Sequence, residues 1–110
     1  MKFAALGRTS WLYNSIEKCR EKGHELVLVA TCKASPEYTV NESDFERLAK
    51  DANCPFLFCT NLSKEEHLGK LAASGADVAI SVNWINIIKS DVLNKCKHGV
   101  LNAHAGDLPR

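Results

Sequence analysis

The sequence has no run of basic residues and no long apolar segment, and each absence excludes a class of protein. Its 14 Lys and Arg are balanced by 13 Asp and Glu, so it lacks the electrostatic footprint of a protein that binds nucleic acid directly. Its apolar stretches are far shorter than the roughly 20 residues of a membrane-spanning helix. The N-terminus also lacks the apolar segment of a signal peptide. We therefore expect a cytoplasmic protein with no membrane partner.

Paired cysteines at metal-binding spacing are absent as well. The chain has five cysteines, Cys19, Cys32, Cys54, Cys59 and Cys96. The number is odd, and no two of them have the Cys-x2–4-Cys spacing of a zinc site. We predict reduced thiols, several of them small core residues, and no metal centre.

Strand-like and helix-like segments alternate along the chain. We expect strands over residues 2–6, 25–31, 55–60 and 77–82 and a fifth beginning at Gly99, and helices over residues 11–22, 43–53, 63–74 and 86–96. The second strand is apolar on both faces, which is typical of a buried parallel strand. The pattern predicts a single α/β domain, a Rossmann-like open parallel sheet with flanking helices that is truncated after about five strands.

Local signals place the helix ends. In the first helix, apolar residues at 11, 12, 16 and 19 have the spacing of one buried face. Ser43 and Ser63 each begin a capping-box pattern, so we expect them to cap the second and third helices. In the third helix we expect Leu68, Leu71 and Ala72 to face inward, and Gly75 to end the helix. Gly23 should end the first helix in a left-handed conformation.

The last strand carries the strongest functional signal. Asn102 and His104 are two residues apart, so both project from one face of a strand near its carboxyl end. Ligands of open parallel sheets bind at that end. An amide can donate a hydrogen bond to a developing oxyanion, and a histidine can move a proton. Taken alone, however, a histidine near a strand end is more often a hydrogen-bonded structural residue than a catalyst.

The ending of the chain resembles the folate-dependent formyltransferases, a family that includes methionyl-tRNA, glycinamide ribonucleotide and sugar N-formyltransferases. The signature of that family is Asn-x-His followed by Ser-Leu-Leu-Pro and an Arg-Gly segment. The matching residues here are Leu101, Asn102, His104, Leu108, Pro109 and Arg110. Gly106 and Asp107 depart from the usual Ser-Leu. The resemblance is strong from Asp77 onward and looser before it.

The resemblance implies the transfer of a formyl group from 10-formyltetrahydrofolate to a substrate amine, a reaction of one-carbon metabolism. It assigns Asn102 and protonated His104 to the oxyanion formed when the amine attacks the formyl carbon. The family uses a third catalytic group, an Asp well beyond Asn-x-His, and Asp107 is too close in sequence to be that residue. We therefore expect residues 1–110 to be the N-terminal part of a formyltransferase-type catalytic domain, inactive alone.

Two further segments are candidate binding residues. Gly7 is followed by Arg8 and Ser10, at a strand-to-helix turn of the kind that binds anions. In the family this loop lies near the amine-bearing substrate, although Ser10 could simply cap the helix. By the same resemblance, Asn86, Ile87 and Ile88 line the pterin pocket, although the two isoleucines could be ordinary core residues.

Two other functions remain open at this point. The chain could be a non-catalytic binding or assembly module, whose half-Rossmann fold pairs with another chain. A nucleotide-binding reductase is disfavoured because the full Gly-x-Gly-x-x-Gly pattern is absent. An exposed edge at the fifth strand leads us to expect a homodimer. The substrate amine, whether a small molecule or an aminoacyl-tRNA, is left undetermined.

Overall fold

The computed structural model describes residues 1–32, 40–59, 64–82, 92 and 94–103. Residues 101–103 are described by their backbone alone. The elements follow one another as β1 (Lys2–Gly7), α1 (Thr9–Glu21), β2 (Glu25–Thr31), α2 (Glu42–Ala52), β3 (Phe56–Phe58), α3 (Glu65–Ser74), β4 (Val78–Val82) and β5 (Val100–Ala103). The described strands form one parallel sheet in the order β3-β2-β1-β4-β5. This confirms the predicted Rossmann-like α/β fold.

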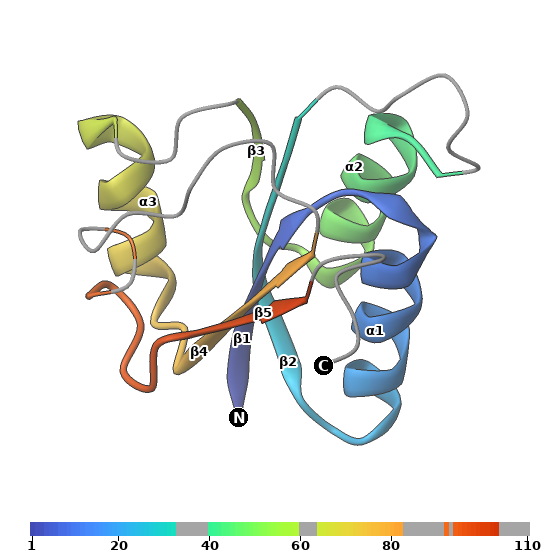
Figure 1. The fold of residues 1–110 in the computed structure, drawn as a ribbon, viewed down its shortest axis with the longest axis horizontal. Helices are drawn as coiled ribbons and strands as arrows, with labels where there is room; N and C mark the ends of the chain where they lie inside the picture. Colours follow the sequence, from blue (N-terminus) through green and yellow to red (C-terminus); the bar gives the residue numbers. More distant parts are fainter. Residues whose placement is uncertain (33–39, 60–63, 83–91, 93, 104–110) are drawn as a thin grey trace.

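Helices cover both faces of the sheet, with α1 and α2 on one side and α3 on the other (Figure 1). The alternation of side chains along β1 builds both layers of the core. Phe3 and Ala5 pack with the buried residues of α1 and α2. Ala4 and Leu6 pack with Leu71 of α3 on the opposite face. The two-sided apolar character of the strands is therefore explained by two separate cores.

The helix starts differ from the prediction. The cap of α2 is Asn41, whose side chain accepts hydrogen bonds from the backbone of Ser43 and Asp44, while the Asp44 carboxylate accepts from the Asn41 backbone. Ser43 is thus inside the helix, and its assignment as the cap was wrong. The start of α3 is also shifted, because Lys64 holds the cap position without a side-chain hydrogen bond. Ser63 lies outside the described residues.

Two expected inward positions are also wrong. Trp11 is 53% exposed, although Leu12 and Ile16 of the same helix are fully buried. Ala72 of α3 is exposed, whereas Leu71 is buried. The end of α3 is as predicted, since the helix ends at Ser74 and Gly75 is its cap. Gly23 also follows α1 with the expected positive φ, +93°.

Other expectations fall partly outside the described residues. Most of the helix expected over residues 86–96 lies there, although Val92 and Cys96 are buried against the α3 side of the sheet. All five cysteines are free. Among the described residues, no group of His, Cys, Asp and Glu could hold a metal ion. Within the same residues, no helix is long and apolar enough to cross a membrane.

Candidate functional site

The carboxyl ends of β1, β4 and β5 are level with one another, and they form the candidate site. Gly7 pairs with Val82, and Val82 pairs with Ala103. Neighbouring strands lie about 4.8 Å apart, so Gly7 and Ala103 are roughly 10 Å apart across β4. The chain runs outward from β1 to β2 and β3, then continues on the other side of β1 with β4. A reversal of this kind leaves a crevice at the carboxyl ends of the two central strands.

Gly7 joins β1 to α1 at this edge, and only glycine fits there. Its φ is +134°, and a Cβ at this position would overlap the carbonyl group of Val82. The close approach lets the backbone N–H of Arg8 donate to the Val82 carbonyl at 2.9 Å. On the other side, the buried Thr31 hydroxyl donates to the Gly7 carbonyl at 2.7 Å. The turn is therefore fixed to both β4 and β2.

The predicted substrate-binding residues Arg8 and Ser10 lie on this turn. Arg8 is the cap residue of α1, with an extended backbone and no side-chain capping bond. Ser10 is the second residue of the helix, so the alternative in which Ser10 caps α1 is wrong. The structure thus brings both residues to the level edge of β1 and β4. Their role in binding a substrate stays a prediction.

Thr9, between them, is a feature that the sequence analysis missed. Its φ is +87°, which is rare for a β-branched residue. Its hydroxyl oxygen is buried and has no hydrogen-bond partner. Strained backbone of this kind costs on the order of 1–3 kcal/mol and is concentrated at functional sites. No sequence signal could have revealed it, because Thr-Ser after glycine reads as an ordinary helix start.

The predicted catalytic pair is placed only in part. The backbone of Asn102 lies in β5, in register with the buried Ser81 of β4. His104 lies outside the described residues, as do the predicted pterin-binding residues Asn86, Ile87 and Ile88. In sequence, Asn86 comes four residues after Val82, the last residue of β4, and His104 comes one residue after Ala103, the last residue of β5. The two strands that precede these residues end at the same edge as the Arg8 turn.

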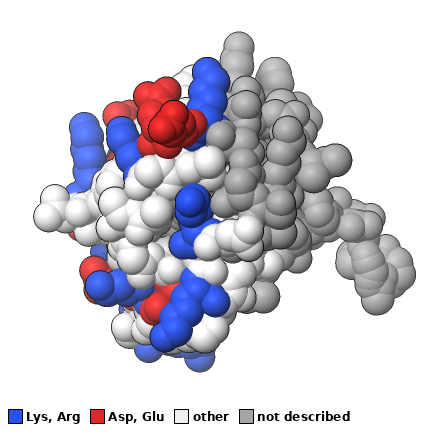
Figure 2. Space-filling view, turned by 90° about the vertical axis from the view of Figure 1, so that its left-hand side faces the viewer, with Lys and Arg blue, Asp and Glu red and all other residues white. Residues whose placement is uncertain are grey.

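The side of the molecule that carries α3 mixes both signs of charge. On its described part, Lys and Arg side chains are spread over the face, and Asp and Glu side chains gather mainly in one group near the top of the view (Figure 2). Near the predicted substrate turn, the largest exposed apolar group is Trp11, in the first turn of α1. Sequence reasoning assigned Trp11 to the core because its spacing fits the buried face of the helix. Trp11 is instead an exposed aromatic residue, three positions beyond Arg8 in the sequence.

Comparison with known proteins identifies the family. The formyl transferase family model matches residues 1–110. The methionyl-tRNA formyltransferases of Afipia carboxidovorans, Caulobacter vibrioides and Methylobacterium sp. are 26%, 27% and 29% identical over 113 residues. Each match covers 100% of this chain, but only 36%, 37% and 36% of the respective relative. The chain thus spans about a third of the length of these curated relatives.

A solved structure gives independent support for the fold. Glycinamide ribonucleotide transformylase 1 from Geobacillus kaustophilus superposes with a TM-score of 0.61 at 16% identity, over 92% of this chain and 56% of that one. An identity this low supports similarity of fold alone. It agrees with the Rossmann-like fold described above. The chain belongs to the formyl transferase family.

Proposed function

We propose that this protein takes part in formyl transfer from 10-formyltetrahydrofolate to a substrate amine, at the carboxyl edge of β1, β4 and β5. The observation that carries the proposal is the register Gly7–Val82–Ala103, which brings the Arg8 turn and the Asn102 strand to one edge. The family match over residues 1–110 supports the class of reaction. The curated relatives act on methionyl-tRNA, so an aminoacyl-tRNA is the first substrate to test.

In this proposal each segment has its own task. Asn102 and protonated His104 donate hydrogen bonds to the formyl oxygen as negative charge develops there on attack by the amine. When the tetrahedral intermediate collapses, the bond between the formyl carbon and the donor nitrogen breaks, the proton lost by the amine is passed to that nitrogen, and tetrahydrofolate leaves. Arg8 and Ser10 hold an anionic group of the amine substrate at the start of α1, where the helix dipole favours negative charge. Asn86, Ile87 and Ile88 bind the pterin ring of the donor. The donor itself supplies the activated formyl carbon.

Residues 1–110 alone are expected to fall short of turnover. They hold the amide and the imidazole of the proposed site, whereas the third group implied by the resemblance, an Asp well beyond Asn-x-His, is not among them. Formyl transfer by the purified chain should therefore stay at background with methionyl-tRNA, glycinamide ribonucleotide or an amino-sugar nucleotide. Formyl transfer above background by the purified chain, if it is lost in His104→Ala, would contradict the expectation that residues 1–110 alone are inactive.

A chimera tests the roles of the two residues. Residues 1–110 would replace the matching segment of the Caulobacter vibrioides enzyme, and circular dichroism would establish that each variant folds. Loss of one preorganised oxyanion donor typically costs 10²–10³ in turnover, so Asn102→Ala and His104→Ala should each lose at least about 100-fold. The matched control Asn14→Ala, at an exposed position within α1, should retain full activity. A folded, active His104→Ala chimera would overturn the assignment.

An assembly role is the second candidate. Among the described strands, β5 is the outermost on its side and pairs only with β4. Exposed strand edges favour pairing with another chain, and closed two-fold pairing is the commonest solution. A homodimer through β5 would sediment as a dimer at micromolar concentration. A clean monomer with a cooperative unfolding transition would exclude it.

A further inference from the structure

Two cysteines follow neighbouring strands at the carboxyl end of the sheet. Cys32 comes directly after Thr31, the last residue of β2. Cys59 comes directly after Phe58, the last residue of β3. The two strands are parallel neighbours in which Thr31 pairs with Phe58 (Figure 1). The backbone N–H of Cys59 donates to the Thr31 carbonyl at 2.9 Å, so the pairing continues one residue further. Cys32 and Cys59 therefore lie opposite each other.

The separation of the two backbones suits a disulfide bond. Neighbouring strands lie about 4.8 Å apart, so the Cα atoms of Cys32 and Cys59 are roughly 5 Å apart. Disulfides join residues whose Cα atoms are roughly 4.4–6.8 Å apart. The strands therefore need not move apart or together for the two thiols to be joined. Neither cysteine is in a disulfide in this structure.

The two side chains belong to the same face of the sheet. Ala30 and Leu57 are register partners, and both are buried in the core on the α3 side. Side chains alternate along a strand, so Cys32 and Cys59, each two positions further on, return to that face. Cys59 packs against this same core, and Cys32 is only 1% exposed. Register and face thus agree in bringing the two thiols together.

The other three cysteines are placed differently. Cys19 and Cys54 pack against the core on the α1 and α2 side of the sheet. Cys96 is buried on the α3 side, but it precedes β5 and so lies toward the amino end of that strand. Cys59 is partly exposed, whereas Cys32 is buried. A small molecule in solution can therefore reach the Cys59 sulfur first, and a large protein partner is disfavoured.

We propose that Cys32 and Cys59 are a thiol-modification site, which reacts with a small soluble disulfide such as oxidised glutathione to form a disulfide between the ends of β2 and β3. The Cys59 thiolate attacks one sulfur of the small disulfide, forming a mixed disulfide and releasing one glutathione thiolate. The Cys32 thiolate then attacks the Cys59 sulfur, and the second glutathione thiolate leaves. The two protons lost by the cysteines are taken up by the two released thiolates. The cysteines are oxidised, and the small disulfide is reduced to two thiols.

This site is near the proposed formyl-transfer edge but does not depend on it. Thr31, whose hydroxyl donates to the Gly7 carbonyl, immediately precedes Cys32. The reaction of the thiols is measured without a formyl donor and without an amine. Either proposal can therefore fail while the other stands.

The test is incubation of the reduced chain with oxidised glutathione, followed by alkylation of the remaining thiols in denaturant and tryptic peptide mapping by mass spectrometry. Cleavage after Lys and Arg places Cys32 in residues 23–33 and Cys59 in residues 51–64. We expect these two peptides to be joined by a disulfide and to carry no glutathione, and dithiothreitol should separate them. Recovery of Cys59 as a glutathione adduct beside an alkylated Cys32 would overturn the proposal, as would full alkylation of both.

Variants assign the bond to its two sulfur atoms. Cys54 shares the tryptic peptide of Cys59, so Cys54→Ser is the matched control, and it should form the same cross-link as the unmodified chain. Cys32→Ala should stop at the mixed disulfide, so that each chain releases one glutathione thiol instead of two. Circular dichroism establishes that Cys32→Ala folds, and the cross-link mapped in the unmodified chain decides the matter if it does not. Loss of the cross-link in Cys54→Ser would contradict the assignment of Cys59.

Discussion

At the scale of single residues, Gly7 is the position on which the proposed site most depends. Its backbone conformation and its contact with Val82 both exclude a Cβ atom. Sequence reasoning marks Gly7 as the end of a strand, but it cannot reveal the contact, because the neighbouring strand comes from a segment some 75 residues later. The sequence therefore predicted the strand end at Gly7, but it could not predict the contact of Gly7 with Val82.

Gly7→Ala should therefore be severely destabilising. The added methyl group must push β1 away from β4, so we expect a loss of about 3 kcal/mol or more in the free energy of unfolding. Gly23→Ala is the matched control, because Gly23 also has a positive φ, +93°, but open space around its Cβ position. It should lose only about 1–2 kcal/mol. Denaturant unfolding measures both, and equal losses would show that the contact with Val82 is unimportant.

The Thr31 hydroxyl should contribute a buried hydrogen bond to the same turn. Thr31→Val keeps the shape of the side chain but leaves the Gly7 carbonyl without its 2.7 Å donor. An unsatisfied buried acceptor costs about 1–3 kcal/mol. Thr31→Ser retains the hydroxyl and should be more stable than Thr31→Val despite its smaller volume. The reverse order in urea denaturation would count against this bond.

Cys54 should make stability depend on pH in the alkaline range. Burial raises its pKa from 9.0 to about 11, so between these pH values the unfolded chain has released a proton that the folded chain retains. Stability is therefore full below pH 9 and falls as pH rises toward 11. The denaturation midpoint should fall less over this range in Cys54→Ala than in the unmodified protein. Identical pH profiles would show that the folded thiol ionises normally.

At the scale of elements, sequence patterns identified each described strand and helix but misplaced the starts of α1, α2 and α3. The periodicity of buried positions is a property of the segment itself, which explains why β2 was predicted with its observed bounds. A cap depends on which of several polar residues turns back onto the helix. Asn41, Ser43 and Asp44 all have suitable side chains, and their competition is decided by backbone geometry that a pattern does not contain.

Substitution of the two competing residues distinguishes the caps of α2. Asn41→Ala removes the acceptor for two backbone N–H groups and should cost about 1 kcal/mol of stability. Ser43→Ala removes only an exposed hydroxyl inside the first turn and should change stability by less than about 0.5 kcal/mol. Thermal unfolding compares the two. A larger loss for Ser43→Ala would restore the capping box that the sequence suggested.

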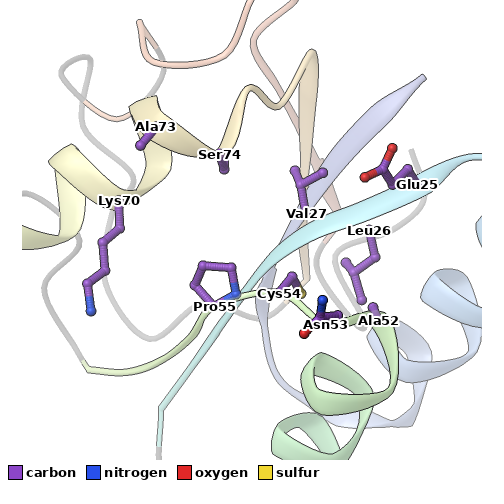
Figure 3. Close-up of a pocket in the computed structure, with 10 residues that line it drawn as sticks. All are labelled: Glu25, Leu26, Val27, Ala52, Asn53, Cys54, Pro55, Lys70, Ala73 and Ser74. Carbon is purple, nitrogen blue, oxygen red and sulfur yellow. The ribbon is translucent and has the colours of Figure 1, made fainter.

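At the scale of the whole molecule, the topology rather than any single motif defines the site. Asn102 and Arg8 are far apart in sequence and come to one edge because β4 lies between their strands. Alternating elements predicted the parallel sheet, and the resemblance to formyltransferases predicted which residues to examine. Neither could predict the register that makes the three strand ends level, because register depends on the packing of side chains between strands. A cavity at the opposite end of the sheet was likewise beyond sequence reasoning, because residues of β2, α2, α3 and the connection between α2 and β3 line it (Figure 3).

The most direct test of the central claim is to map where a reduced folate binds on this chain. Amide shifts would be followed during titration with 5-formyltetrahydrofolate, a stable isomer of the proposed donor. If the donor binds at the proposed site, we expect shifts at Gly7, Val82 and Ala103, at the carboxyl edge of β1, β4 and β5. For residues 1–110 alone, we expect an affinity no tighter than about millimolar. The amides of Val27 and Asn53, at the opposite end, should stay unchanged. Shifts centred at that opposite end, with the carboxyl edge unaffected, would contradict the proposed location of the formyl-transfer site.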